Sequence, residues 1–188
     1  MNTTRVKQSL KYAWQHKHMV YSYLLLRLAM VSPFVGLNAF FHKLRGVIIG
    51  KEVKIAHDVL IDSLEPQNVI LEDYVTISPR VTIHAHTTPT DCGAGIVKPV
   101  RIRESTWICV GATILPGVTV GRHCVIGAGA VVAEDIPDFT LAFGIPAKPV
   151  RTLKKMYEIP KNATLHRVLV LEDENLSEKN AQFKKEKD

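Results

Sequence analysis

The sequence predicts a mainly β protein built around a left-handed parallel β-helix that runs from about Ile49 to Ile136. Two observations predict this fold. An aliphatic residue recurs every six positions, and a small or β-branched residue follows four positions after it. The aliphatic positions are Ile49, Ile55, Ile61, Leu71, Ile77, Ile83, Ile102, Ile108, Ile114, Val120, Ile126 and Val132. The companion positions are Val53, Val59, Val75, Val81, Thr106, Ala112, Val118, Cys124, Ala130 and Ile136.

A period of six excludes a single helical face, because apolar positions on a helix drift with a period of about 3.6 residues. Three short strands joined by tight corners make one triangular coil, and stacked coils pair like parallel strands about 4.8 Å apart. Glycines are expected to relieve crowding where the chain bends. These glycines are Gly50, Gly111, Gly117, Gly121, Gly127 and Gly129.

Two interruptions break the six-residue pattern. The first is a slip at Leu64–Asn68, which contains Pro66. The second is an insertion from Thr87 to Pro99 that lacks the repeat. We expect residues 47–153 to form one β-helix domain with an extruded loop at 87–99, and long loops that leave a regular scaffold often carry function.

Residues 1–46 are expected to form a basic, hydrophobic helical segment. Residues 1–50 contain seven Lys and Arg residues and no Asp or Glu. Arg27 and Pro33 interrupt the apolar stretch and disfavour a spanning helix. Short helices either cap the β-helix or lie on a membrane surface, and both readings stay open. Residues 154–188 are expected to be a C-terminal extension, with a possible strand or helix within 152–170 and a charged tail.

The length and composition of the chain limit the classes of protein to which it could belong. A chain of 188 residues is long enough for one domain with appendages. The three cysteines, Cys92, Cys109 and Cys124, are too few and too widely spaced for a disulfide framework or a tetrahedral metal site. We expect a cytoplasmic protein without a signal peptide, resident metal or nucleic-acid partner.

The segment TWICVGATILPGVTVGRHCVIGAGAVVAEDIP, followed by FGIPAKPVR, resembles the hexapeptide-repeat acyltransferases. It looks most like the sugar and polysaccharide O-acetyltransferases related to maltose, galactoside and colanic-acid acetyltransferases. The resemblance covers about residues 46–153. It implies a homotrimer with active sites between subunits, acetyl-CoA as co-substrate, and a hydroxyl of a sugar or glycan precursor as acceptor. Residues 1–46 lie outside the resemblance, and their basic, hydrophobic composition leads us to expect that they hold the trimer near the inner face of the cell membrane.

The same resemblance selects His86, in VTIHAHTTP, as the general base. A positioned imidazole that takes the hydroxyl proton typically contributes about 10²–10⁴-fold. His84 has several readings: an acceptor contact, an interface residue, or a metal ligand beside His86. A metal site of this kind would resemble that of the γ-class carbonic anhydrases, which carry a further pair of histidines. Residues 47–153 of this chain offer only His57 and His123 besides His84 and His86, and these two do not form a pair.

The donor contacts follow from the resemblance, position by position. The cofactor-binding residues that it implies are Trp107, Cys109, Val110, Gly127, Ala128, Lys148 and Arg151. Cys109 replaces a glycine of the family pattern, and Ala133-Glu134 replaces Thr-Lys. Lys148 and Arg151 are expected to bind the CoA phosphates, because ammonium and guanidinium groups are suited to that role. The alternative interpretation is that both are ordinary surface charges.

Asp62 and Glu65, beside the slip, resemble an acidic corner near the acceptor, where carboxylates accept hydrogen bonds from sugar hydroxyls. The alternative is that both are solvated corner residues. Two other functions remain open. One is N-acetylation of an amino-sugar nucleotide, and the other is a non-catalytic β-helix scaffold.

Overall fold

The computed structural model describes residues 20–87 and 96–153. Contacts divide the chain into two compact units, residues 1–152 and 153–188, and every element described below belongs to the first. The strand or helix expected after residue 152, the charged tail and most of the 87–99 loop lie outside the described residues.

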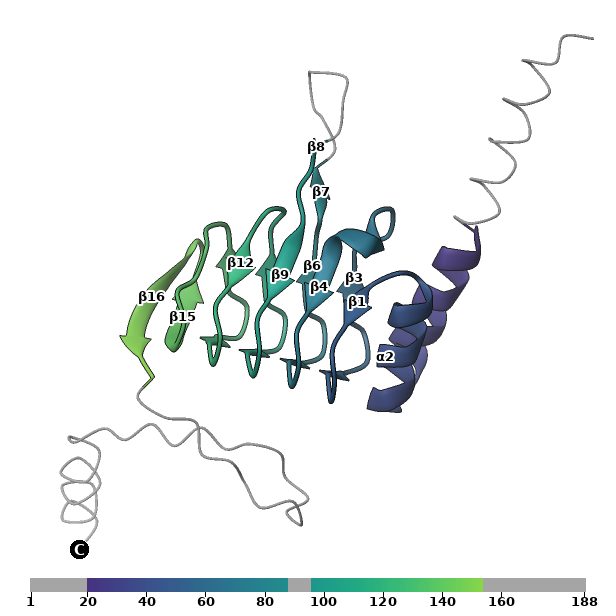
Figure 1. Cartoon of the computed structure of the whole chain (residues 1–188), viewed down its shortest axis with the longest axis horizontal. Helices are drawn as coiled ribbons and strands as arrows, with labels where there is room; N and C mark the ends of the chain where they lie inside the picture. The colour runs from purple at the N-terminus through teal and green to yellow at the C-terminus, as the bar shows by residue number, and fades with distance from the viewer. Residues whose placement is uncertain (1–19, 88–95, 154–188) are drawn as a thin grey trace, which may run out of the picture. The chain divides into compact units, whose positions relative to one another are not determined.

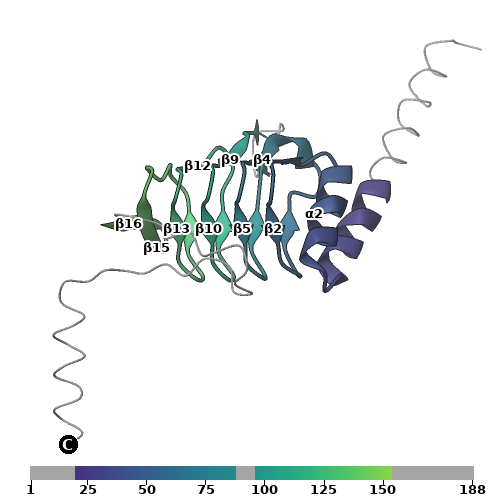
Figure 2. The same cartoon turned by 60° about the horizontal axis from the view of Figure 1, so that its bottom comes forward.

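Three parallel sheets form the sides of a β-helix (Figures 1 and 2). The first sheet contains β1 (Ile48–Ile49), β4 (Val69–Leu71), β9 (Val100–Ile102) and β12 (Thr119–Val120). The second begins with β2 (Lys54–Ile55), β5 (Thr76–Ile77), β10 (Trp107–Ile108) and β13 (Val125–Ile126). The third contains β3 (Leu60–Ile61), β6 (Thr82–Ile83), β11 (Thr113–Ile114) and β14 (Val131–Val132). The chain visits the three sheets in turn, so these strands make four stacked coils.

The core is the column of aliphatic side chains inside these coils. In the second sheet Ile77 pairs with Ile55 and Ile108, and Ile108 pairs with Ile126. In the third sheet Ile83 pairs with both Ile61 and Ile114. All of these side chains are buried. Burying each one contributes about 1.5–3 kcal/mol, and the predicted six-residue register is confirmed.

The corners use two kinds of glycine. Gly111, Gly117 and Gly129 have positive φ angles, as expected for tight bends. Gly121 instead allows close packing between coils, because a Cβ there would lie 2.5 Å from the backbone nitrogen of Asp138. Left-handed corners do not always use glycine: His123 has a φ of 53°.

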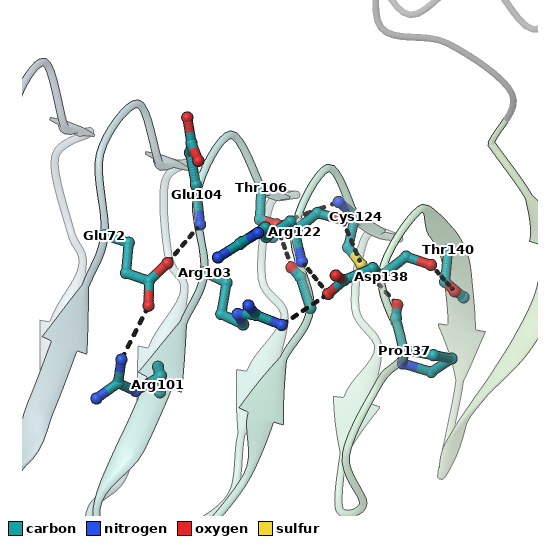
Figure 3. Close-up of polar contacts among 11 residues, drawn as sticks. Glu72, Arg101, Arg103, Glu104, Thr106, Arg122, Cys124, Pro137, Asp138 and Thr140 are labelled. Atoms are coloured by element: carbon teal, nitrogen blue, oxygen red, sulfur yellow. Dashed lines mark hydrogen bonds and ion pairs between the residues drawn. The ribbon is translucent and has the colours of Figure 1, made fainter.

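Polar side chains join successive coils along the corner between the first and second sheets (Figure 3). The carboxylate of Asp138 accepts hydrogen bonds from Arg103 and from the backbone N–H of Arg122, at 3.0 and 2.8 Å. The thiol of Cys124 donates to the carbonyl of Pro137 at 3.0 Å. Burial raises the pKa of Cys124 to about 11. This cysteine is therefore a protonated packing residue at neutral pH.

Different elements cover the two ends of the coil. At one end β15 (Thr140–Gly144) pairs parallel with β13, and β16 (Ala147–Thr152) turns back antiparallel to β15. At the other end a helix at residues 20–31 precedes α2 (Val35–Leu44), which packs on β1 and β2. The amide of Asn38 donates to the carbonyl of Ile55 at 3.2 Å. Among the described helices, none combines the length and apolarity needed to span a bilayer.

Candidate active site

The predicted site residues occupy two different corners of the triangular coil. Asp62, Glu65, His84 and His86 lie where the chain leaves the third sheet for the first. His86 begins β7 (His86–Thr87), which pairs antiparallel with β8 (Ile96–Val97) and projects from the coil (Figure 1). The structure therefore brings the predicted base and the predicted acceptor residues to one corner.

At this corner Asp62 and His86 form a direct contact. The Nδ1 atom of His86 lies 2.7 Å from Oδ2 of Asp62, although the residues are 24 positions apart in the sequence. Since an ionised carboxylate only accepts hydrogen bonds, Nδ1 must carry the proton of this contact. In the neutral ring the Nε2 atom then has the lone pair. The His86 side chain is 20% exposed, whereas that of Asp62 is fully buried.

The turn around Asp62 explains why its carboxylate is held so firmly. Its Oδ1 atom accepts from the backbone N–H groups of Leu64 and Glu65, at 3.0 and 2.8 Å. Its Oδ2 atom accepts from the backbone N–H of Ala85, at 2.6 Å, as well as from His86. Short-range bonds of this kind let aspartate start a turn, which here leads into the 3₁₀ segment Pro66–Asn68.

The protonation of Asp62 follows from two opposing effects. Burial alone would raise its pKa, but the hydrogen bonds from Glu65, Ala85, His86 and Leu64 outweigh burial and lower the pKa below its ordinary value. Asp62 is therefore a carboxylate at neutral pH. A buried negative charge therefore lies directly beside the imidazole ring of His86.

This position of Asp62 corrects the direct acceptor contact expected from the sequence. Its side chain has no exposed surface, and both of its oxygens are engaged by donors within the chain. Sugar hydroxyls therefore cannot reach this carboxylate. Glu65 is half-buried, and its Oε2 atom accepts from Gln67 and Asn68. His84 is also half-buried, and its backbone N–H pairs with Ile114.

Behind the Asp62–His86 pair lies a buried arginine that the sequence reasoning missed. The guanidinium of Arg45, just after α2, donates to the carbonyls of Ile61 and Asp62, at 3.0 and 2.7 Å. It also contacts Nδ1 of His42, at 3.2 Å. Asn38, His42 and Arg45 recur at helical spacing and are all buried. That spacing of polar residues was the available sequence signal.

The predicted donor residues lie at a different corner, between the second and third sheets. Cys109 and Val110 follow β10, and Gly127 and Ala128 follow β13. A Cβ at position 127 would lie 2.7 Å from the Cβ of Phe143. The packing of Phe143, rather than the approach of a ligand, therefore explains the glycine at this position. Ala128 and Val110 are exposed. Burial raises the pKa of the Cys109 thiol.

Trp107 lies beside this second corner. Its indole Nε1 donates to the hydroxyl of Ser78 at 2.8 Å, which fixes the ring across two neighbouring coils. The side chain remains partly exposed. A held aromatic ring of this kind offers a rigid apolar surface to a ligand.

Lys148 and Arg151 both lie on β16, at the end of the second sheet. The ammonium of Lys148 is 3.0 Å from Glu134, and both side chains are exposed. Glu134 thus occupies the position where the family resemblance implied lysine, and it partly neutralises the cation expected to meet phosphate. Exposed pairs of this type are weak and yield readily to a stronger anion.

Within one chain, one side of the triangular coil separates the His86 corner from the donor corner. The first corner offers an oriented imidazole. The second offers small exposed residues, a fixed indole and cations. Within residues 20–87 and 96–153, no three His, Cys, Asp or Glu side chains are grouped as metal ligands.

Comparison with known families settles the class of the repeat. The family described as "Bacterial transferase hexapeptide (six repeats)" matches residues 99–134, which form most of the third and fourth coils. Over these residues the chain carries the repeat that defines the hexapeptide transferases. The predicted family is confirmed.

The curated relatives of this chain include named acetyltransferases. A putative acetyltransferase of Schizosaccharomyces pombe is 42% identical over 91 residues, which cover 46% of this chain and 44% of the relative. The galactoside O-acetyltransferase of Lactococcus lactis is 37% identical over 95 residues, which cover 48% and 46%. The chain spans about half the length of the curated relatives it matches.

Solved structures confirm the left-handed β-helix of this chain. A maltose O-acetyltransferase from Clostridium difficile superposes with a TM-score of 0.62 at 24% identity, covering 76% of this chain and 89% of that one. A hexapeptide-repeat acetyltransferase from Vibrio cholerae, complexed with acetyl coenzyme A, gives 0.64 at 22%, covering 74% and 89%. At these identities the likeness establishes the fold.

Proposed function

We propose that this hexapeptide-repeat transferase is an acetyltransferase that moves the acetyl group of acetyl-CoA directly to a hydroxyl of a sugar or glycan precursor. His86 is the general base. The contact between Nδ1 of His86 and Asp62, at 2.7 Å, is the observation that carries this proposal, because it leaves the lone pair on Nε2. The acetyltransferase names of the relatives support the donor class.

The transfer needs no covalent enzyme intermediate. Nε2 of His86 takes the hydroxyl proton as the acceptor oxygen forms a bond to the thioester carbonyl carbon. Asp62 stabilises the imidazolium that results. The carbon–sulfur bond then breaks, and His86 returns the proton to the departing thiolate. An oriented base of this kind contributes about 10²–10⁴-fold to the rate.

The donor is proposed to lie along the corner between the second and third sheets. Trp107, Cys109, Val110 and Ala128 would line the pantetheine arm. Lys148 and Arg151 would meet the phosphates, since ammonium and guanidinium groups suit that role. Gly127 would act through packing, by admitting Phe143.

The assembly is proposed to be a homotrimer in which two copies complete each site. In one chain the base and the donor residues lie at different corners, so a neighbouring copy would bring its donor corner to His86. Mixing inactive His86→Ala and Trp107→Ala subunits tests this arrangement. Recovery of activity in the mixture supports shared sites, whereas mixtures as inactive as their parents contradict them.

The acceptor is proposed to contact Glu65 and His84, which lie beside His86 and are partly exposed. We also propose that the enzyme works at the cytoplasmic face of the cell membrane, on lipid-linked glycans. The basic residues near the N-terminus support that location, because anionic lipid attracts them.

The decisive experiment measures thiol release from acetyl-CoA with a panel of sugars and amino-sugar nucleotides. We expect turnover with hydroxyl acceptors and a loss of about 10²–10⁴-fold in kcat for His86→Ala. His57→Ala is the matched control, because His57 also contacts an aspartate, at 3.0 Å, but on the surface. Wild-type turnover by His86→Ala would overturn the role of His86. Turnover with amines alone would favour N-acetylation, and no binding of acetyl-CoA would favour a scaffold.

A further inference from the structure

The N-terminal helices expose apolar residues to solvent, and α2 also buries polar ones. The buried residues of α2, Asn38 and His42, are polar, and so is the buried Arg45 that follows the helix. The exposed residues of the same region are apolar, among them Leu37 and Phe40. A helix on the surface of a water-soluble domain normally shows the opposite arrangement.

The helix at residues 20–31 is apolar on both sides. Leu25, Leu26 and Ala29 are buried against the protein. Its outward residues are also large and apolar, and Val31 is 80% exposed. Helices that are hydrophobic all round are found in protein cores or in contact with lipid.

These outward residues belong to one region of the molecule. The helix at 20–31 and α2 lie side by side at the end of the β-helix (Figures 1 and 2), and Arg45 bonds to Ser22 across them at 3.2 Å. We call the outward set the N-terminal apolar face, and it contains Leu24, Leu28, Val31, Phe34, Leu37 and Phe40. Exposed apolar residues gathered on two neighbouring helices are typical of an interaction site.

We infer that the N-terminal apolar face docks on a bilayer that contains anionic phospholipid, with both helices lying in the interface. Arg27 and Lys43 are exposed beside the apolar residues and suit lipid phosphates. Tyr21 and Tyr23 are about half exposed, and tyrosine favours the depth of the headgroups.

The charge of the N-terminal region favours lipid over a second copy of this chain as the partner that covers the N-terminal apolar face. Residues 1–50 contain seven Lys and Arg residues and no Asp or Glu. Two copies meeting through this face would therefore bring cations together without acidic partners. Anionic lipid supplies the missing negative charge.

This inference rests on the proposed location of the enzyme and names the surface responsible for it. The test is flotation of the full chain with vesicles of phosphatidylcholine alone or mixed with phosphatidylglycerol. We expect flotation with the mixed vesicles, weakened by added salt. Leu28→Glu and Phe40→Glu each lower the partition coefficient by about ten-fold or more, because each removes apolar burial and adds a repelled charge. Phe139→Glu is the matched control, because Phe139 is an exposed apolar residue beside Arg122, at the corner between the first and second sheets and outside the proposed donor site.

The outcomes separate the two proposals. Loss of flotation in the face variants, with Phe139→Glu unaffected and acetyl-CoA binding retained by all, supports the inference. Flotation of the face variants at the wild-type level overturns it while leaving the membrane location standing. Failure of the wild-type chain to float overturns both, but leaves the acetyl transfer by His86 intact. Lipid-free self-association that Leu28→Glu and Phe40→Glu abolish would identify a second copy as the occupant and overturn the inference.

Discussion

The guanidinium of Arg45 donates to the backbone carbonyl of Asp62 at 2.7 Å, and so joins the end of a helix to the residue that holds His86. A second bond, 3.0 Å long, reaches the carbonyl of Ile61. Because Asp62 accepts from Leu64, Glu65, Ala85 and His86, its position depends on the backbone that Arg45 holds. The N-terminal helices therefore contribute to the geometry of the site.

Replacing Arg45 tests this connection. We expect Arg45→Gln to lower kcat about ten-fold or more while the KM for acetyl-CoA stays near the wild-type value, because the donor corner is distant from Arg45. Arg45→Lys should recover part of the loss, since one ammonium is able to reach a carbonyl but lacks the fork of donors. Steady-state kinetics with both substrates varied shows whether kcat falls while the KM for acetyl-CoA stays unchanged. Equal changes in kcat and in the KM for acetyl-CoA would indicate a general loss of structure instead.

Replacing Asp62 with Asn should lower kcat by about 10²–10⁴-fold, because the amide cannot accept from all the donors that now face the carboxylate. Each donor left without an acceptor also costs about 1–3 kcal/mol of unfolding free energy. Kinetics and urea denaturation measure the two effects. Asp58→Asn is the control, since Asp58 contacts His57 on the surface. A full rate in Asp62→Asn would show that His86 does not depend on this carboxylate.

Removing the charge of Glu134 should strengthen acetyl-CoA binding. Glu134→Gln releases Lys148 from its 3.0 Å contact, and we expect a dissociation constant about two- to five-fold lower. Lys148→Gln should have the opposite effect. Calorimetric titration at two salt concentrations checks both, because the difference should shrink as salt screens the charges. Glu52→Gln, at an exposed corner of the first coil, is the control. Unchanged affinity in both Glu134→Gln and Lys148→Gln would remove Lys148 from the phosphate site.

The stability of the chain should fall in mild acid because of His42. Burial, reinforced by the charge of Arg45, lowers the pKa of His42 from 6.5 to about 3. Between these values the unfolded chain binds a proton that the folded chain does not, so the unfolding free energy decreases as the pH falls. The slope contributed by His42 approaches about 1.4 kcal/mol per pH unit at its steepest.

Urea denaturation at a series of pH values from 7 to 4 measures this slope. His42→Gln should have a flatter profile than the wild type, whatever its stability at pH 7. His57→Gln, which changes an exposed histidine, should keep the wild-type slope. Parallel profiles for wild type and His42→Gln would show that His42 is protonated equally in the folded and unfolded states.

The β-helix was predictable because its core depends on a local rule. Ile77, Ile108 and Ile126 recur at positions that the six-residue period selects, and the structure pairs them in register. The hairpin of β15 and β16 was not predicted, because residues 140–152 do not repeat the pattern and pair antiparallel. Corners such as His123 also adopt left-handed φ without glycine, which composition does not reveal.

The candidate site was predictable in part. His86 came from a family resemblance, and the structure gives its ring a defined orientation. Asp62 was selected as an acceptor contact, but it is buried beneath His86 instead. The pairing of Ile61 with Ile83 contained the relevant information, since it brings the residue after Ile61 next to the segment that leads to His86. Arg45 lay outside the repeat and outside the resemblance.

The sequence by itself determined the coil. The triangular core is filled only if the residue at every sixth position is apolar and of the right size, and that can be read directly from the sequence. Only the tertiary structure decided that Asp62 would hold His86, 24 residues away, and that Arg45 would hold Asp62. Those contacts depend on how one coil stacks on the next and on how a helix covers the open end. Stacking brings together residues that no local pattern relates, and it leaves the polar side of α2 buried and its apolar side exposed.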